Sequence, residues 1–371
     1  MNGKNRIDIL ILVAVFVLMI FSIGAVYSAS ASFSQDKFQD SLYLFKQHLV
    51  KVVFSIVAMF ILAKMDYRIL ERYAKPMIII SILLLIYTVA FGSGPIKGAS
   101  RWISIGPINF QPSEVARYAL IIYLSVLLSR KKEYMNLLYR GYLPVLFYVL
   151  IVTGLVLIQP NFSVAIIIFS TSMMMIFLSR AKLKHIGFTF AALAPVVLVF
   201  VLSKDYILAR ISSYTEYKSS GNTSYQLQQA LIGFGNGGLT GVGPGNSYQR
   251  DFFLPEAHGD FIFSIIGEEY GFIGALIILS LYMMIIYRGY MVAKECTDEF
   301  GKYLAFGITT LITLNALVNM AVASGVLPTT GVTLPFVSYG GTSIIFSAMA
   351  VGVLLNISSR KKEDAESLSI A

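Results

Sequence analysis

The chain has 371 residues, of which 56% are hydrophobic and 13% charged, and its formal net charge at pH 7 is +9. The apolar residues form runs near or above the ~20 residues that a membrane span needs, so this is the composition of an integral membrane protein. Lys and Arg lie in short clusters between these runs, where they report membrane orientation, and nucleic acid is not an expected partner. Cys296 is the only cysteine, which excludes an intramolecular disulfide, a cysteine zinc cluster and a thiol redox pair.

The apolar runs predict an all-α fold of ten membrane-spanning helices. The first run follows Lys4 and Arg6 and ends in YSASAS, which is similar to a signal-peptide cleavage site. Its apolar core of roughly twenty residues is longer than that of a signal peptide, so we predict a retained span. The predicted spans are residues 7–27, 46–63, 76–92, 112–129, 142–158, 163–179, 185–203, 261–287, 303–324 and 337–357.

Positive charge tests this arrangement independently, because it marks the cytoplasmic loops of membrane proteins. The opposite loops, 159–162 and 325–336, contain no Lys or Arg. Since the charged loops alternate with these, we predict that both termini are cytoplasmic, which agrees with an even number of spans. The positive clusters that share one side are Lys4 and Arg6; Lys64, Arg68, Arg72 and Lys75; Arg130, Lys131, Lys132 and Arg140; Arg180, Lys182 and Lys184; Arg288, Lys294 and Lys302; and Arg360, Lys361 and Lys362.

One connection on the outer side, residues 203–260, is far longer than an ordinary loop, which predicts a functional or partly re-entrant segment. Within it, SYQLQQALIGFG from Ser224 predicts a short amphipathic helix. We therefore predict one polytopic membrane domain, residues 1–359, with an outer loop at about 204–260 and a short cytoplasmic tail at 360–371. No internal repeat is evident, which disfavours an inverted-repeat transporter.

Glu256, His258 and Asp260 fall within one eight-residue stretch, LPEAHGDF, just ahead of the eighth predicted span. A carboxylate at the mouth of a membrane helix is costly to desolvate, so it is a functional-site candidate. The alternative interpretation is a polar loop end, with Asp260 as the N-cap of the following helix. The residues by themselves leave both interpretations open.

A second polar cluster begins at Arg101, next to the only tryptophan, and continues to Glu114 and Arg117. Glu114 and Arg117 stand three residues apart, so on a helix they share a face and can form an ion pair. The pair could anchor the fourth helix, or its guanidinium could contact a phosphate or diphosphate group at the outer face. Glu268 and Glu269, in the eighth span, could serve helix packing or a polar cavity.

Glycine and histidine give weaker signals. Gly233, Gly235 and Gly238 match GxGxxG, but no strand precedes them, so a nucleotide site is not expected. The glycines instead predict tight turns and close backbone approach at membrane depth. The histidines are scattered without metal-ligand spacing, which argues against a zinc site, and His48 and His185 are expected at the membrane interface.

The stretch from Asn319 to Ser343, NMAVASGVLPTTGVTLPFVSYGGTS, resembles the C-terminal motif of the SEDS family (shape, elongation, division and sporulation). The FtsW, RodA and SpoVE proteins form this family. The resemblance covers nearly the whole chain, in order. The other motifs that carry it are YSAS at Tyr27–Ser30, RWI at Arg101–Ile103, QPSE at Gln111–Glu114, and LPEAHGDFIF followed by GEEYGFIG.

The resemblance implies a peptidoglycan glycosyltransferase of the bacterial cytoplasmic membrane, which polymerises lipid II at the outer face. It implies that Asp260 is the catalytic aspartate, and we assign it as the base that deprotonates the acceptor hydroxyl. Arg101 and Arg117 are the candidates to stabilise the departing diphosphate. The complete set expected to support the site or bind substrate is Arg101, Glu114, Arg117, Glu256, His258, Ser338, Gly340 and Gly341.

The resemblance also implies partners. SEDS proteins work with a class B penicillin-binding protein, a single-span transpeptidase, so we expect this partner and other division proteins. We expect no metal site built by the protein itself. A divalent cation, Mg or Mn, bound through the substrate diphosphate is the one cofactor that the reaction suggests.

Branch-specific residues favour the division proteins. GNSYQ at Gly245–Gln249 and the threonines of PTTGVTLP are typical of FtsW, although Thr330 and Phe336 are similar to RodA. The chain departs from the family at Asn161, where aspartate is usual, at Arg117, where lysine is common, and in the HGD triplet, where the family has HTD.

Other functions fit the same residues. A RodA-type elongation polymerase is the nearest alternative. A lipid II transporter, or flippase, would use Asp260 as a gate or proton site, and ten helices around a charged cavity suit it equally well. A noncatalytic division scaffold is the third alternative.

Overall fold

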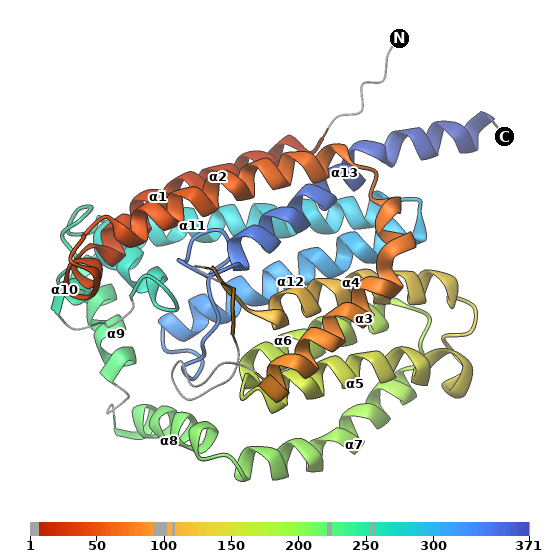
Figure 1. The fold of residues 1–371 in the computed structure, drawn as a ribbon, viewed down its shortest axis with the longest axis horizontal. Coiled ribbons are helices and arrows are strands. Elements are labelled where there is room, and N and C mark those ends of the chain that lie inside the picture. The colour runs from red at the N-terminus through yellow and green to blue at the C-terminus, as the bar shows by residue number, and fades with distance from the viewer. Residues whose placement is uncertain are drawn as a thin grey trace.

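The computed structural model describes residues 7–91, 102–105, 108–220, 225–252, 254 and 257–370. It is a helical bundle in which α1, α2, α11, α12 and α13 run side by side (Figure 1). One antiparallel hairpin, β1–β2, precedes α4. The elements are α1 (Ile9–Phe38), α2 (Tyr43–Lys64), α3 (Arg68–Phe91), β1 (Ile103–Ile105), β2 (Ile108–Phe110), α4 (Pro112–Arg130), the π-helix η1 (Leu138–Tyr142), α5 (Leu143–Ile158), α6 (Phe162–Leu178), α7 (Leu183–Leu202), α8 (Asp205–Ser220), α9 (Tyr225–Gly237), α10 (Tyr248–Phe252), α11 (Ile262–Glu295), α12 (Glu299–Ala323) and α13 (Ser343–Ile370).

The predicted spans correspond to ten helices. In the part of the chain that the structure describes, nine helices are long and apolar enough to cross a membrane, and α6 is an apolar helix of 17 residues. The remaining helices, α8, α9 and α10, lie in the long outer connection, where only α9 was predicted. The predicted all-α fold is confirmed, with a short β hairpin added.

Several predicted boundaries are wrong. The third span begins at Arg68 instead of residue 76, and the eighth continues to Glu295 instead of residue 287. The first helix continues past residue 27 to Phe38, because small residues of the YSASAS stretch and the turn after it pack against protein; Ser30 and the following Ser34 are fully buried. The last span starts at Ser343 instead of residue 337. Residues 337–342, VSYGGT, are rich in glycine and hydroxyl side chains, and they form a loop that bonds to the backbone of His258 and Gly259.

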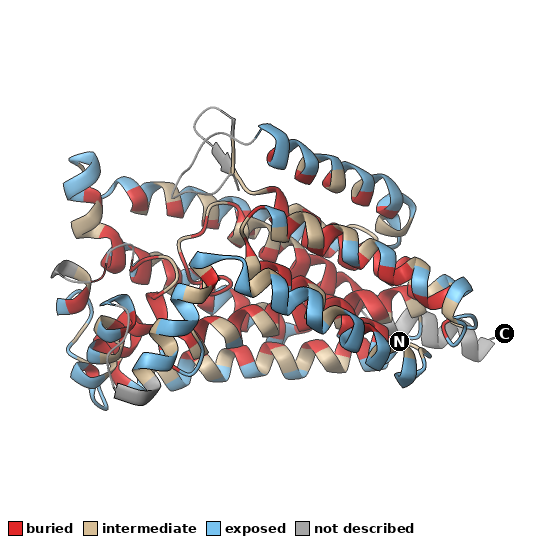
Figure 2. Cartoon of the chain, turned by 90° about the horizontal axis from the view of Figure 1, so that it is seen from below, coloured by how far each residue is buried: buried red, intermediate tan, exposed pale blue. Residues whose placement is uncertain are grey.

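The buried centre of the bundle consists of α4, α12 and the first part of α13, whose side chains are mostly inaccessible (Figure 2). α2 packs along α13, and α3 packs along α4. α7 is the opposite case, since nearly all of its side chains are exposed and it contacts mainly α6 and α8. The exposed apolar residues of the outer helices suit contact with lipid, because lipid chains are as apolar as these side chains.

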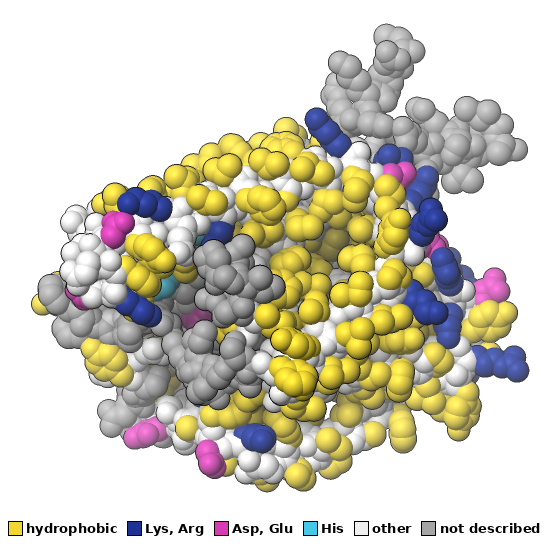
Figure 3. Space-filling model, in the orientation of Figure 1, with side chains coloured by type: hydrophobic (Ala, Val, Ile, Leu, Met, Phe, Trp, Pro, Cys, Tyr) yellow, Lys and Arg dark blue, Asp and Glu magenta, His cyan; other side chains and the backbone are white. Residues whose placement is uncertain are grey.

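Positive charge gathers at one end of the molecule, the end where both termini lie, and a broad apolar surface follows it (Figure 3). The start of α1 and the end of the last span meet there, because the Asp8 amide donates to Ser358 Oγ at 3.0 Å. Arg288, near the end of α11, is ion-paired with Asp8. Three helix ends therefore share one face of the bundle.

α11 is interrupted at Gly271, whose φ of 66° and ψ of −165° are not helical. In a continuous helix, the two amides after Gly271 would donate to the carbonyls of Glu268 and Glu269. Here the two amides donate instead to carbonyls of the glycine-rich segment that follows α9, and the two carbonyls accept from amides of the same segment. These backbone groups therefore all keep a hydrogen bond at the break. The exchanged bonds are Phe272 N to Gly238 O (2.9 Å), Ile273 N to Leu239 O (3.2 Å), Val242 N to Glu268 O (3.0 Å) and Gly243 N to Glu269 O (3.0 Å).

This exchange requires very close backbone approach. Gly241 has a φ of 83°, and a Cβ atom there would collide with the Glu269 carbonyl. A Cβ atom at Gly271 would collide with the backbone of Gly241 and Leu239. The structural interpretation of the glycine-rich run is therefore confirmed.

Candidate functional site

Asp260 lies in a tight turn, residues 258–260, just before α11. Each of the three backbone carbonyls in this Asp260 turn accepts a hydrogen bond. The donors belong to α12 and to the α12–α13 loop, residues 324–342. The bonds are Tyr339 N to His258 O (2.8 Å), Ser338 Oγ to Gly259 O (2.7 Å) and Asn319 Nδ2 to Asp260 O (2.9 Å). The backbone beneath the carboxylate is thereby fixed by segments distant in sequence.

The Asp260 side chain is partly exposed. The N-cap of α11 is Phe261, without a side-chain capping bond, so the alternative prediction of Asp260 as N-cap is wrong. Gly331 lies beside the carboxylate, since a Cβ atom built there would stand 3.7 Å from Asp260 Oδ2. A glycine at this position keeps the α12–α13 loop from covering the carboxylate with a side chain.

Glu114 and Arg117 form the predicted ion pair in the first turns of α4. Their exposed fractions are 6% and 5%. Arg117 also donates to Asn315 Oδ1 at 3.2 Å and to Ser343 Oγ at 3.4 Å. The buried guanidinium is therefore paired with a carboxylate and hydrogen-bonded, as a buried ion requires.

α12 connects the two polar clusters. Asn315 bonds to Arg117, and Asn319, one helical turn further, bonds to the Asp260 turn. Asn319 also donates to Val332 O at 2.8 Å, which fixes the α12–α13 loop. Thr333 Oγ1 lies 3.4 Å from Ser343 Oγ, the same hydroxyl that contacts Arg117. One framework therefore holds the carboxylate of Asp260 and the guanidinium of Arg117.

His258 is buried between aromatic rings. Its ring centroid lies 5.2 Å from that of Phe33 and 5.3 Å from that of Tyr339. Tyr339 donates its hydroxyl to Gln47 Oε1 at 2.8 Å. Burial raises the pKa of Tyr339 to about 12, so this phenol stays protonated and remains a donor at physiological pH.

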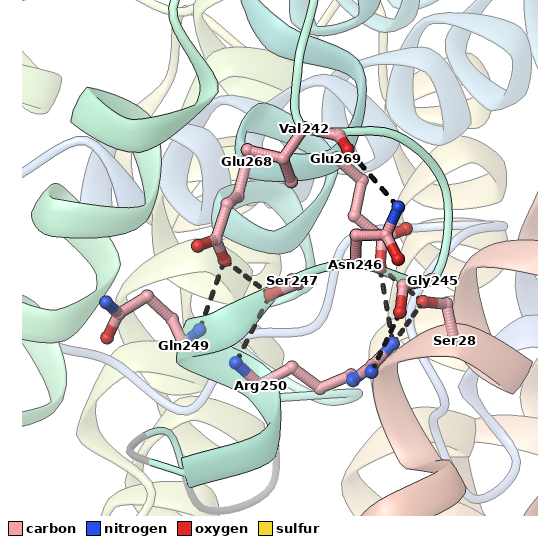
Figure 4. A network of polar contacts seen from close by, with 9 residues as sticks. All are labelled: Ser28, Val242, Gly245, Asn246, Ser247, Gln249, Arg250, Glu268 and Glu269. Atoms are coloured by element: carbon pink, nitrogen blue, oxygen red, sulfur yellow. Dashed lines mark hydrogen bonds and ion pairs between the residues drawn. The ribbon is translucent and has the colours of Figure 1, made fainter.

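A separate network surrounds the two carboxylates ahead of the α11 break (Figure 4). Glu268 accepts from the Ser247 hydroxyl, and Glu269 accepts from the Ser28 hydroxyl. Arg250 Nη1 lies 3.4 Å from Glu269 Oε1 and 2.7 Å from Ser28 Oγ. These contacts join the outer connection to α1 and α11, which supports the helix-packing interpretation of both glutamates.

The remaining residues predicted to support the site are Arg101, Glu256, Ser338, Gly340 and Gly341. Arg101 and Glu256 lie outside the described residues. Ser338 supports the site through the backbone, because its hydroxyl donates to Gly259 O and accepts from the Leu334 amide at 2.8 Å. Gly340 and Gly341 lie in the α12–α13 loop directly before α13.

The prediction for His48 is wrong. Its side chain is 0% exposed, so it lies inside the bundle and not at the interface, and Nε2 is 2.9 Å from Ser22 Oγ. Sequence reasoning also missed Asn315, Arg250 and Lys51. A polar residue inside an apolar span is the signal that could have identified Asn315 and Lys51.

The described residues do not form a metal centre. Among them, no group of three or more His, Cys, Asp and Glu side chains gathers closely enough to hold an ion.

In the described part of the chain, nine helices are long and apolar enough to span a membrane, and a tenth is a shorter apolar helix. Together with the hydrogen-bonded turn that carries Asp260, they define a multi-pass membrane protein with a polar site. The chain belongs to the FtsW/RodA/SpoVE family of cell cycle proteins, whose sequence profile matches residues 8–363. It is 39% identical to the probable peptidoglycan glycosyltransferase FtsW of Geobacter metallireducens, over 96% of both chains. It is 36% identical to stage V sporulation protein E of Bacillus subtilis, over 96% of this chain and 98% of that one.

Solved structures share the fold. One comes from a study of polymerization and crosslinking by a peptidoglycan synthase complex; it is 27% identical, with a TM-score of 0.78 over 97% of this chain and 99% of that one. The rod shape determining protein RodA of Thermus thermophilus, at 24% identity, matches with a TM-score of 0.70 over 96% and 98% of the two chains.

Proposed function

We propose that this chain is a peptidoglycan glycosyltransferase that polymerises lipid II into glycan strands, for septal synthesis during cell division. Family membership supports the enzyme class, and relatives named FtsW at up to 39% identity support the division role. The observation that carries the proposal is the Asp260 turn. Its three carbonyls are all bonded while its carboxylate remains partly exposed, as a positioned general base requires.

In the proposed reaction, Asp260 removes the proton from the 4-hydroxyl of the acceptor GlcNAc. The oxygen of that hydroxyl attacks the anomeric carbon of the donor MurNAc. The bond from this carbon to the diphosphate breaks, and the electron pair leaves with undecaprenyl diphosphate. In-line attack inverts the α linkage to β. One carboxylate suffices, because a diphosphate leaves without the acid that glycoside hydrolysis needs.

Arg117 is the proposed stabiliser of the departing diphosphate, since a fixed cation is most effective where negative charge develops. Glu114 and Asn315 hold its guanidinium in place. Arg101 is proposed for the same role from the sequence. A divalent cation would enter with the substrate diphosphate, because the described residues gather no ligand set of their own.

His258 is proposed as a positioning residue. It is buried between two rings, and its carbonyl belongs to the bonded turn, so it orients Asp260 through the backbone. Glu256, from the sequence, is proposed to tune the same carboxylate.

The proposed setting is the bacterial cytoplasmic membrane, with both termini in the cytoplasm and the site at the outer face. Positive charge at the end of the bundle that holds both termini supports this orientation. The proposed partner is a class B penicillin-binding protein. A structural relative belongs to a peptidoglycan synthase complex that coordinates polymerization and crosslinking, which supports this pairing.

Reconstitution tests the function. The purified protein, with its cognate class B partner and penicillin to block crosslinking, is incubated with labelled lipid II in detergent. We expect glycan ladders on a gel. Detergent removes the bilayer, so a transporter would make no product, and absence of ladders with a correctly folded protein contradicts the proposal.

A further inference from the structure

Lys51 is a cation inside a membrane-spanning helix. It lies eight residues after the start of α2, about 12 Å along the helix axis, and it is half-buried. A lysine at such depth is costly unless it has a partner or a function. Among the ion pairs of the described residues, none includes Lys51.

Through its contact with an aromatic ring, Lys51 is connected to the candidate site. Its Nζ stands 4.3 Å from the centroid of the Tyr339 ring. The Tyr339 amide bonds to His258 O in the Asp260 turn, and the Tyr339 hydroxyl bonds to Gln47, one helical turn before Lys51. The ring therefore ties this part of α2 to the turn that carries the proposed base.

Lys51 and Arg117 approach the site from different helices. Lys51 on α2 contacts the Tyr339 ring, and Arg117 on α4 contacts Ser343 Oγ, so the two cations reach the segment that leads into α13 from two helices that both pack on α13. Arg117 is held by an ion pair with Glu114, whereas Lys51 faces an aromatic ring. An ammonium carries three donors, and an aromatic face leaves donors available for an anion.

We propose that Lys51 binds the diphosphate that the acceptor lipid retains through the reaction, at a subsite separate from that of Arg117. This inference rests on the proposed function. Joining two lipid-linked sugars brings two diphosphates to one site, and only the donor's diphosphate becomes a leaving group. Arg117 stabilises the diphosphate that leaves with the donor lipid. Lys51 binds the diphosphate of the acceptor lipid in both the ground state and the transition state.

This division of roles predicts a particular kinetic pattern. An interaction that is equal in the ground state and the transition state lowers KM without changing kcat. Lys51→Met keeps the length and the contact with the ring but removes the charge. We expect KM for lipid II to rise about tenfold, the effect of losing one charge-assisted contact, with kcat within about twofold of wild type. Lys51→Arg should restore most of the affinity.

The control is Lys64→Met, an exposed lysine at the other end of the same helix, which should change neither constant. Unchanged KM in Lys51→Met overturns the proposal. A fall in kcat at unchanged KM also overturns it, because that result would assign Lys51 to the leaving group.

A binding measurement separates this inference from the proposed function, because it needs no turnover. Farnesyl diphosphate is titrated calorimetrically into wild type, Lys51→Met and Lys64→Met in detergent. We expect about tenfold weaker binding to Lys51→Met alone, even if wild type makes no glycan. Equal binding by all three proteins contradicts the inference. Inorganic diphosphate in a parallel titration should bind more weakly than the lipid; equal affinity would contradict a lipid-specific site.

Discussion

At the scale of single residues, the site depends on polar groups that find partners only in the fold. The sequence predicted the Glu114–Arg117 pair because helical spacing determines which neighbours meet. It could not predict that Asn319 would bond to the Asp260 carbonyl, 59 residues away in sequence. Lys51 could have been identified as a charge inside an apolar span, but its contact with Tyr339 could not be predicted, since that ring comes from a distant loop.

Asn319→Leu should damage both stability and activity. It leaves the carbonyls of Asp260 and Val332 without their donor, and an unsatisfied buried group costs about 1–3 kcal/mol. Thermal unfolding in detergent and the glycan assay measure the two effects. Thr313→Val is the control, because that hydroxyl bonds only within α12. A variant that unfolds and polymerises like wild type would refute the role of this amide.

The buried pair gives a second prediction. Glu114→Gln leaves Arg117 buried without its carboxylate, which should cost about 3–5 kcal/mol. The double variant Glu114→Gln/Arg117→Met removes both charges and should be more stable than Glu114→Gln. Lys132→Met, which breaks the more exposed pair with Glu299, should change stability by less than about 1 kcal/mol. Thermal midpoints in one detergent rank the variants, and a double variant no more stable than Glu114→Gln would contradict the coupling.

At the scale of elements, apolar runs predicted each membrane helix because hydropathy reports exposure to lipid. They did not predict helix ends, where burial against protein replaces lipid contact, as in the extension of α1 to Phe38. α8 was missed because its sequence is polar, and the start of α13 was misplaced because residues 337–342 are used to bond the Asp260 turn. The break in α11 and its exchanged bonds also depend on contacts that no local pattern reveals.

Gly271→Ala tests the break. The glycine has a φ of 66°, and an added Cβ would meet the backbone of Gly241 and Leu239. We expect a loss of at least about 2 kcal/mol in stability, with weaker protection of the outer connection against hydrogen exchange. Gly235→Ala is the matched control, because it lies in α9 with open space around it and alanine favours a helix. Equal thermal midpoints for the two variants would show that the break carries no strain.

At the scale of the whole molecule, the uneven distribution of Lys and Arg among the loops predicted a membrane orientation that is compatible with the fold. The positively charged loops gather at one end of the bundle. The Asp260 turn directly precedes α11, which begins at the opposite end. An even number of spans lets both termini share the charged end. The enzyme class follows from the named relatives, because helices around a polar site also occur in transporters.

Cysteine labelling checks the orientation. Cys296 is buried, so Cys296→Ser provides a suitable background. Val326 and Tyr139 are 60% and 81% exposed, on loops predicted to face opposite sides. With a membrane-impermeant maleimide on spheroplasts, Val326→Cys should react at once and Tyr139→Cys only after permeabilisation. The reverse pattern would invert the proposed topology.

The most direct test of the central claim is lipid II polymerisation by Asp260→Asn. Asparagine keeps the shape of the side chain, and the three bonds to the turn involve only backbone carbonyls, so folding should be preserved. Asp205→Asn, on the exposed start of α8, is the control. Loss of a general base predicts a fall of about 10²–10⁴-fold in the polymerisation rate for Asp260→Asn and no change for Asp205→Asn. A correctly folded Asp260→Asn protein that makes glycan at the wild-type rate would contradict the account.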